Sequence, residues 1–242
     1  FSKFQETYEV IQRARVSHPN VSCLLNFVMS KFNYKYYKNI IDFANAAFPG
    51  APLGIAYARG LTHERDATDI PINTYMEAQR YLEAQKRNHT RANPYTLMFD
   101  SINGQTASII RDTVTGKRTD LGCGAGRHFI VVYDNGAVYP CELLEHIGIP
   151  EPCRSGEHQP TDPCLGNLND YNYDMYALLA SPPAEELVRW IDHHKCSCTW
   201  ECAIYSKIMH SPKEWGKLAG AAVRYLFKRR VVPSTSPQVR AD

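Results

Sequence analysis

Seven of the eight cysteines in this 242-residue chain lie after residue 120, and this clustering limits what the chain can fold into. Thiols that only fill a core are spread along a sequence, as Cys23 is, whereas a local cluster favours a metal site or disulfide bonds. The odd number disfavours complete pairing among them. The seven late cysteines are Cys123, Cys141, Cys153, Cys164, Cys196, Cys198 and Cys202.

A β-hairpin is predicted around Asp134-Asn135-Gly136, because apolar and β-branched residues flank this turn over 128–133 and 137–141. We expect Asn135 and Gly136 to supply the positive φ angles of a tight turn, which sets Ile130 opposite Cys141. The glycine-rich segment 122–126 then folds back and brings Cys123 to the base of the hairpin. Its bare backbone N–H groups suit an anionic sulfur neighbour.

The segment 196–202 can supply two further thiolates to the pair from the hairpin. Four thiolates suit either tetrahedral zinc or a [4Fe–4S] cluster, and residue types alone do not choose between them. Common zinc ribbons use two C-x2-C knuckles, which are absent from this sequence, so the spacing favours iron–sulfur. His193 and His194 beside Cys196 offer a zinc alternative, although a polar helix end is the preferred interpretation of these histidines.

The first 60 residues alternate between helical and strand patterns, which predicts an α/β fold with parallel β/α units. Helices are expected over 4–14 and 34–48, with Asn33 capping the second and Pro49-Gly50 ending it. Strands are expected over 21–29, buried on both faces, and over 53–57. Further helices are predicted at 71–88, 94–112, 184–193 and 213–229, with an irregular loop over 145–183 and a disordered tail after 231.

Two polar residues directly follow the predicted strands, where active sites of β/α barrels gather. Asn33 and Arg59 are therefore candidate cofactor-binding residues. For Asn33 the helix cap is the better interpretation. For Arg59 recognition of a carboxylate and a structural role are balanced.

Residues 122–202 resemble the auxiliary-cluster domain of radical S-adenosylmethionine enzymes, called SPASM in its full form and twitch in its shortened form. The resemblance lies in Cys123, twelve residues, Gly136, four residues and Cys141; in the Gly-Asn-Leu element at 166–168; and in the closing group Cys-Ser-Cys-Thr-Trp-Glu-Cys over 196–202. The full SPASM pattern closes with more cysteines than this chain has. The resemblance therefore implies a twitch-like domain with one auxiliary [4Fe–4S] cluster.

The ligands expected for that cluster are Cys123, Cys141, Cys198 and Cys202, with Cys196 in reserve. Cys198 and Cys202 are preferred because a spacing of four places them on one side of a helical turn. Cys153 and Cys164 are interpreted as free thiols, with a mutual pair as the alternative.

Residues 1–60 resemble the last units of the partial barrel of the same enzymes, which holds S-adenosylmethionine over a second [4Fe–4S] cluster bound by C-x3-C-x2-C. That motif is absent from these 242 residues, so the resemblance implies the C-terminal part of a longer protein. We expect barrel units over 1–60, a helical linker region over 61–120, the auxiliary domain over 121–212, and a final helix and tail over 213–242. The implied activity is radical modification or oxidation of a peptide or small molecule, with a flavodoxin or ferredoxin as electron donor, in the cytoplasm.

The overall composition sets further limits. The formal net charge of +2 gives no strong field for nucleic acid or an anionic membrane, and no apolar run approaches the ~20 residues that span a bilayer. Two alternatives stay open: a zinc-stabilised binding module without catalysis, and a secreted disulfide-bonded protein.

Overall fold

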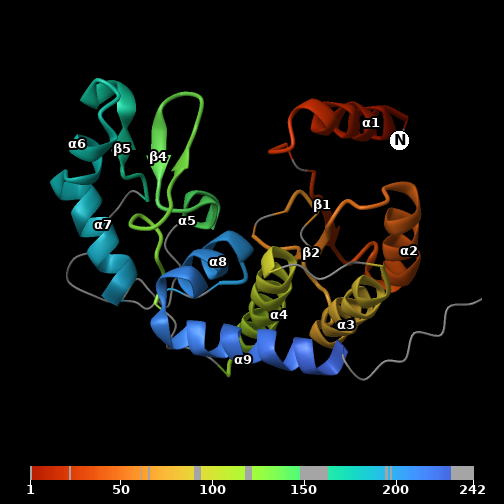
Figure 1. Cartoon of the computed structure of the whole chain (residues 1–242). Coiled ribbons are helices and arrows are strands. Elements are labelled where there is room, and N and C mark those ends of the chain that lie inside the picture. Colours follow the sequence, from red (N-terminus) through yellow and green to blue (C-terminus); the bar gives the residue numbers. More distant parts are fainter. Residues whose placement is uncertain are drawn as a thin grey trace, which may run out of the picture.

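The computed structural model shows a mixed α and β protein with two hydrophobic cores (Figure 1). The first core surrounds a small parallel sheet and the second surrounds a small antiparallel sheet. Within the described residues, no helix combines the length and apolar character needed to cross a bilayer. The structure describes residues 2–21, 23–60, 62–64, 66–89, 94–117, 122–147, 163–193, 196 and 198–229.

The parallel sheet consists of β1 (Leu25–Met29) and β2 (Leu53–Tyr57), paired from Leu25 opposite Leu53 to Met29 opposite Tyr57. Their connection runs through a 3-10 turn, η1 (Tyr34–Tyr36), and helix α2 (Tyr37–Ala47). This confirms the predicted strand, helix and strand order with parallel pairing. The two strands show β/α pairing, while a barrel stays a prediction.

Helices cover this sheet and complete the first core. α1 (Ser2–Ser17) packs through Tyr8 against Phe48, while α3 (Ile72–His89) and α4 (Pro94–Val114) supply fully buried residues such as Tyr75 and Ile110. The segment 61–120, predicted as a linker region, therefore contributes to the same core as the strands.

The expectation that the first strand is buried on both faces is wrong for β1. Its side chains alternate, with Leu25, Phe27 and Met29 buried and Asn26 and Val28 exposed. The apolar run is continuous in the sequence, but only one face of this strand is buried in the first core. β2 is more enclosed, as its burial pattern shows.

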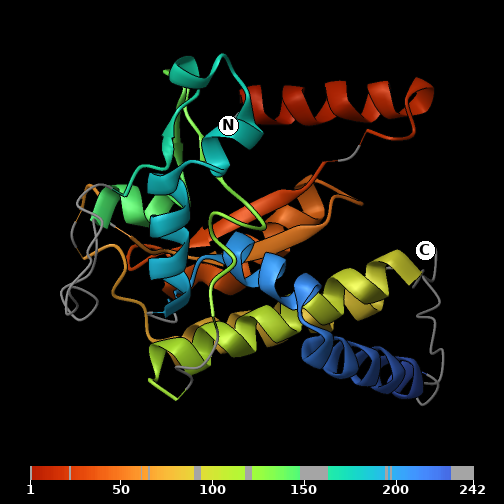
Figure 2. The same cartoon turned by 90° about the vertical axis from the view of Figure 1, so that its left-hand side faces the viewer.

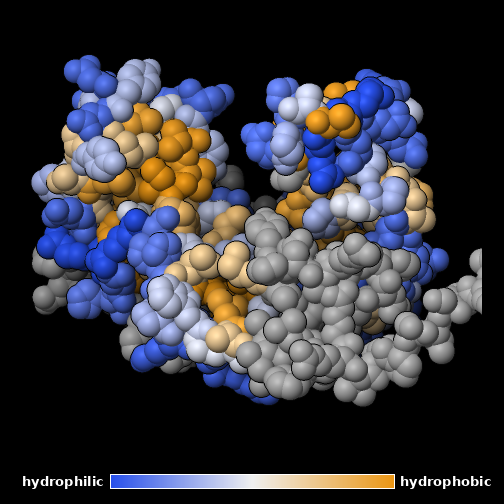
Figure 3. Space-filling model, viewed as in Figure 1, coloured by the Kyte–Doolittle hydropathy of each residue, from blue (hydrophilic) through white to orange (hydrophobic). Residues whose placement is uncertain are grey.

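The second core is built on the antiparallel sheet of β3 (Val131–Val132), β4 (Ala137–Tyr139) and β5 (Gly166–Asn167). Around it lie α5 (Glu142–Ile147), η3 (Leu168–Tyr171), α6 (Met175–Leu179) and α7 (Pro182–His193). Residues 163–183 are thus more ordered than the irregular loop expected, because Leu165, Leu168 and Leu178 are buried against the sheet. Figure 3 shows apolar side chains gathered on this lobe and a hollow beside it.

The hairpin forms, but its register differs by one residue from the prediction. Val131 pairs with Tyr139, and Tyr133 donates its N–H to Ala137 O at 3.0 Å, so the loop holds three residues rather than two. Gly136 alone adopts a positive φ, of 83°. A three-residue loop ending in a left-handed glycine is the next most common hairpin connection.

Two C-terminal helices join the cores. In α8 (Glu201–His210), Ala203 packs into the second core, while Ile204 and Ile208 pack into the first. α9 (Pro212–Arg229) then packs against α4 and crosses it at an angle, as Figure 2 shows from the side. The tail expected to be disordered lies outside the described residues.

Tyr75 gives a test of this first core. Its side chain is 1% exposed and its ring meets that of Tyr57 edge-on, with centroids 5.2 Å apart. Burial raises the pKa of the Tyr75 hydroxyl above its ordinary value. The Tyr75 hydroxyl therefore loses its proton at a lower pH in the unfolded chain than in the folded one. Because this favours the unfolded chain at high pH, the free energy of unfolding falls as pH rises above about 10.

Tyr75→Phe removes this contribution, so its free energy of unfolding should fall less steeply than that of the wild type between about pH 9.5 and 11.5. Urea unfolding at a series of pH values measures the difference. Tyr176→Phe, at a ring 88% exposed, is the control and should follow the wild type. Parallel curves for Tyr75→Phe and wild type would contradict the assignment.

Candidate cysteine site

Cys141 lies where β4 leads into α5, and it is 8% exposed. The backbone N–H of Leu144 points to Cys141 Sγ, with a nitrogen–sulfur distance of 3.4 Å. Burial raises the pKa of the Cys141 thiol, while backbone N–H groups of Leu144 and Leu143 act in the opposite direction. The start of α5 thus offers hydrogen-bond donors to a sulfur that water hardly reaches.

Cys123 precedes a compact turn of glycine-rich backbone. Within it, His128 N–H donates to Gly124 O at 2.8 Å, and Gly126 N–H donates to Phe129 O at 2.9 Å. Burial raises the pKa of the Cys123 thiol, and the backbone N–H of Ala125 and the charge of Lys207 oppose this rise. This sulfur has the same combination of desolvation and backbone donation as Cys141.

Cys198 lies in the extended segment before α8. Burial raises the pKa of its thiol to about 12, while the backbone N–H of Trp200 acts against the rise. Cys123 and Cys141 raise this pKa further, and Arg59 lowers it. Cys141 belongs to the second core and Cys123 and Cys198 pack against it, although the three thiols come from three separate segments of the chain.

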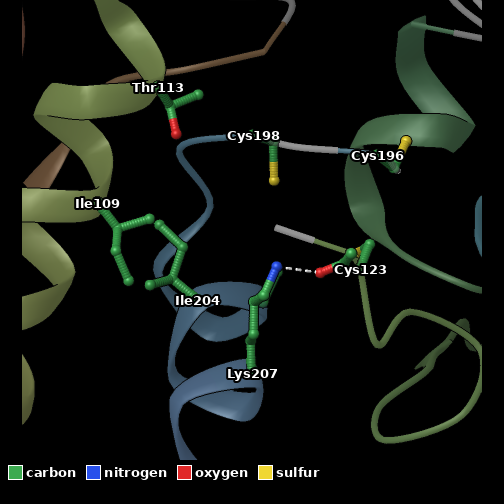
Figure 4. Close-up of a pocket in the computed structure, with 9 residues that line it drawn as sticks. Ile109, Thr113, Cys123, Cys196, Cys198, Ile204 and Lys207 are labelled. Carbon is green, nitrogen blue, oxygen red and sulfur yellow. Dashed lines mark hydrogen bonds between the residues drawn. The ribbon is translucent and has the colours of Figure 1, made fainter. Parts of the chain in front are cut away.

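A pocket opens beside Cys123 and Cys198, and Figure 4 shows the Cys198 sulfur projecting into it. Cys141 is not among the residues that line it. About 310 Å³ of its space is free of protein atoms, part of it continuous with solvent. Lys207 reaches from α8 to donate to Gly122 O at the rim. The lining residues are Ile109, Thr113, Gly122, Cys123, Cys196, Cys198, Ala203, Ile204 and Lys207.

The remaining predicted ligands occupy two different positions. Cys196 lines the same pocket as Cys123 and Cys198. Cys202 lies in the first turn of α8, where the residue as a whole is exposed. Partial desolvation of its thiol raises the pKa, the charge of Arg59 lowers it, and the charges of Glu201 and Glu142 raise it.

Cys198 and Cys202 do not lie on one side of a helical turn, which corrects the expectation from their spacing. Trp200, which caps α8, has extended backbone, so Cys198 lies outside the helix that carries Cys202. Their spacing of four residues therefore says nothing about how close the two sulfur atoms lie.

Cys164, which is described in the structure, does not line this pocket. The Cys164 thiol donates to Val138 O at 3.4 Å and to Gly166 O at 3.3 Å, inside the antiparallel sheet. Cys153, and with it any pairing to Cys164, lies outside the described residues, as does His194.

Arg59 follows β2 and contacts both segments that follow the cysteines. Its guanidinium pairs with Glu142 Oε1 at 3.0 Å and with Glu201 Oε2. The other oxygen of Glu201 accepts the Tyr57 N–H at 2.9 Å. Two guanidinium nitrogens of Arg59 are thus paired with glutamates, while its buried Nε has no hydrogen-bond partner among the described residues. A cofactor-binding role for Arg59 stays a prediction.

Asn33 does not cap the following helix, which corrects the cap expectation. Its Oδ1 accepts the Ser30 N–H at 2.8 Å, and its Nδ2 donates to Val28 O at 3.0 Å. The side chain therefore closes the loop after β1 onto the strand itself. Both ends of the amide are used there, and its cofactor-binding role stays a prediction.

Sequence reasoning missed Glu142, Glu201 and Lys207. The two glutamates carried a local signal, since Glu142 follows Cys141 and Glu201 precedes Cys202. Their shared partner Arg59 is 83 and 142 residues away, and no local pattern reveals such a distance. Lys207 sits on a helix that the sequence analysis did not identify.

The donor set of this site is sulfur, with backbone N–H groups aimed at each of the three central thiols, which suits thiolate ligation. Among the described residues, no three or more His, Cys, Asp or Glu side chains are arranged to share a single metal ion.

Comparisons with known proteins give limited similarity. No family model matches this sequence, and no curated protein matches it. Among solved structures, the chain is similar to native anSMEcpe with bound AdoMet and Kp18Cys peptide, at 15% identity and a TM-score of 0.42. The match covers 95% of this chain but only 60% of that one. At this level the comparison does not assign the chain to a family.

Proposed function

We propose that this chain binds one auxiliary [4Fe–4S] cluster through Cys123, Cys141, Cys198 and a fourth thiolate. The observation that carries the proposal is the gathering of three thiols from separate segments, each facing a backbone N–H group. Cys202 is our first choice for the fourth ligand because residues 196–202 resemble the closing cysteine group of auxiliary-cluster domains, and no longer because of a shared helical turn. Cys196 is the alternative, since it lines the same pocket.

The surroundings of these thiols suit a buried anionic centre. Burial alone disfavours three neighbouring thiolates, as their raised pKa values show. Iron removes this penalty, because a coordinated thiol is deprotonated and its charge is shared with the metal. The backbone N–H groups and the nearby ammonium of Lys207 further stabilise negative charge on sulfur. When bound, such a cluster accepts or donates single electrons.

We further propose that the chain is part of a longer protein that performs radical S-adenosylmethionine chemistry, with a peptide or small molecule as substrate and a flavodoxin or ferredoxin as electron donor. This wider proposal is supported by the cysteine and glycine spacing of residues 122–202 and by the β/α order before it. In this proposal, the residues of this chain hold the auxiliary cluster and form the surface beside it.

Anaerobic purification of the chain tests the cluster directly. We expect about four iron and four sulfide per chain, visible absorption near ~400 nm, and a paramagnetic signal after one-electron reduction. Colourless protein with one zinc per chain would contradict the cluster proposal and support a zinc-stabilised binding module. Thiols that mass spectrometry finds joined in disulfides would contradict both.

A further inference from the structure

Arg59 stands between two glutamates that adjoin the cysteine segments. Glu142 directly follows Cys141, and Glu201 lies three residues after Cys198. The guanidinium pairs with both, and Glu201 also accepts the N–H of Tyr57 from β2. One residue at the carboxyl end of β2 therefore holds the starts of α5 and α8 together.

The packing at the next residue supports the same contact. A Cβ placed on Gly60 would lie 3.1 Å from Leu143 Cδ2, so the backbone after β2 closely approaches the first turn of α5. Because Leu143 is two residues from Cys141, this approach brings the segment that carries Cys141 close to the backbone after β2.

The three charged side chains are shielded from water to different degrees. The Arg59 and Glu201 side chains are 20% and 16% exposed, and that of Glu142 is 40% exposed. Partly buried pairs gain little net stability because desolvation offsets attraction, so their clearest benefit is a fixed geometry. One arginine against two glutamates also leaves a formal charge of −1 beside the thiols, and removing the arginine would make it −2.

We infer that Arg59 is a positioning residue that seats the Cys141 and Cys198 segments on the carboxyl end of β2 and thereby sets the environment of the cluster. This inference rests on the proposed cluster. Its structural part, the docking of the two segments on β2, can be measured with or without metal.

The test compares Arg59→Met, Arg59→Lys and the double variant Arg59→Met with Glu201→Gln. The double variant restores the formal charge of −1 but not the bridge. Arg13→Met, at an exposed arginine in α1 whose partner is Glu9, is the matched control. Three quantities are measured on each: amide hydrogen exchange over residues 53–60, the rate of iron release to a chelator, and the cluster midpoint potential.

We expect Arg59→Met to accelerate exchange at Tyr57 and iron release about tenfold each. The added negative charge should make reduction about tenfold less favourable, or about 59 mV for one electron. Arg59→Lys should recover the potential, with exchange and iron release between those of Arg59→Met and wild type. The double variant should recover the potential alone, and Arg13→Met should match the wild type throughout.

Two results would overturn the inference. The first is that Arg59→Met shows the exchange and iron-release rates of the wild type. The second is that the double variant recovers all three quantities, because Arg59 would then act only through its charge and not as a bridge. If Arg59→Met does not fold, Arg59→Lys decides by the same two rates. Failure of the cluster proposal is recognised separately, because it appears as unmutated chain without iron.

Discussion

Cys141→Ser will abolish the absorption near ~400 nm and leave less than about one tenth of the wild-type iron. Among the three central thiols, Cys141 is the one at a fixed helix start, with Leu144 N–H directed at its sulfur. A serine oxygen forms the same hydrogen bond but is a poor ligand for iron in such a cluster. Cys123→Ser and Cys198→Ser should have the same effect, measured as iron and sulfide per chain after anaerobic purification.

Two control variants make this series specific. Cys23→Ser, far from the pocket in the sequence, and Cys164→Ser, inside the antiparallel sheet, should both keep the wild-type iron content. Cys196→Ser and Cys202→Ser identify the fourth ligand. The variant at the ligand should lose iron, and the other should retain the wild-type iron content. Wild-type iron content in Cys141→Ser would contradict the proposed ligand set.

Local patterns in the sequence were enough to predict the two strands of the parallel sheet and the hairpin, but not helices α5 and α8, which adjoin the cysteines. The apolar pattern of each strand and the turn of the hairpin at 134–136 are set by residues within a few positions of one another. The cysteine segments could be recognised for the same reason, because motif spacing is local.

The hairpin register could not be predicted, because distant residues help to shape its turn. Asn167 Nδ2 and Asn169 Nδ2 both donate to Asn135 O, at 3.2 and 3.1 Å, and these residues belong to or follow β5. A β-strand of two residues leaves no alternating pattern to detect. The three-residue loop is therefore consistent with contacts made 32 and 34 residues along the chain.

The bridge at Arg59 escaped prediction for a related reason. A strand-end arginine can bind a ligand or pair with acids, and the sequence does not show which acids fold against it. The structure places Glu142 and Glu201 there, so much of the interaction capacity of the guanidinium is used within the protein.

Gly126→Ala will destabilise the second core by about 2–4 kcal/mol, measured as the free energy of unfolding in urea. Gly126 has φ +80°, which disfavours any side chain, and a Cβ there would lie 2.6 Å from Val188 Cγ2 in α7. Because this turn also carries Cys123, the change should lower the iron content of the chain as well.

The strain and the collision at Gly126 can be separated. Gly50→Ala is a matched control, since Gly50 has φ +82° but no atom within 4 Å of its added Cβ, and it should cost only about 1 kcal/mol. Val188→Ala removes the methyl group that the added Cβ would contact. The double variant Gly126→Ala with Val188→Ala should therefore lose about 1–2 kcal/mol less stability than the two single variants lose together. Equal losses in Gly126→Ala and Gly50→Ala would mean that α7 yields to the added methyl group. The close packing of this turn on α7 would then be no constraint on the position of Cys123.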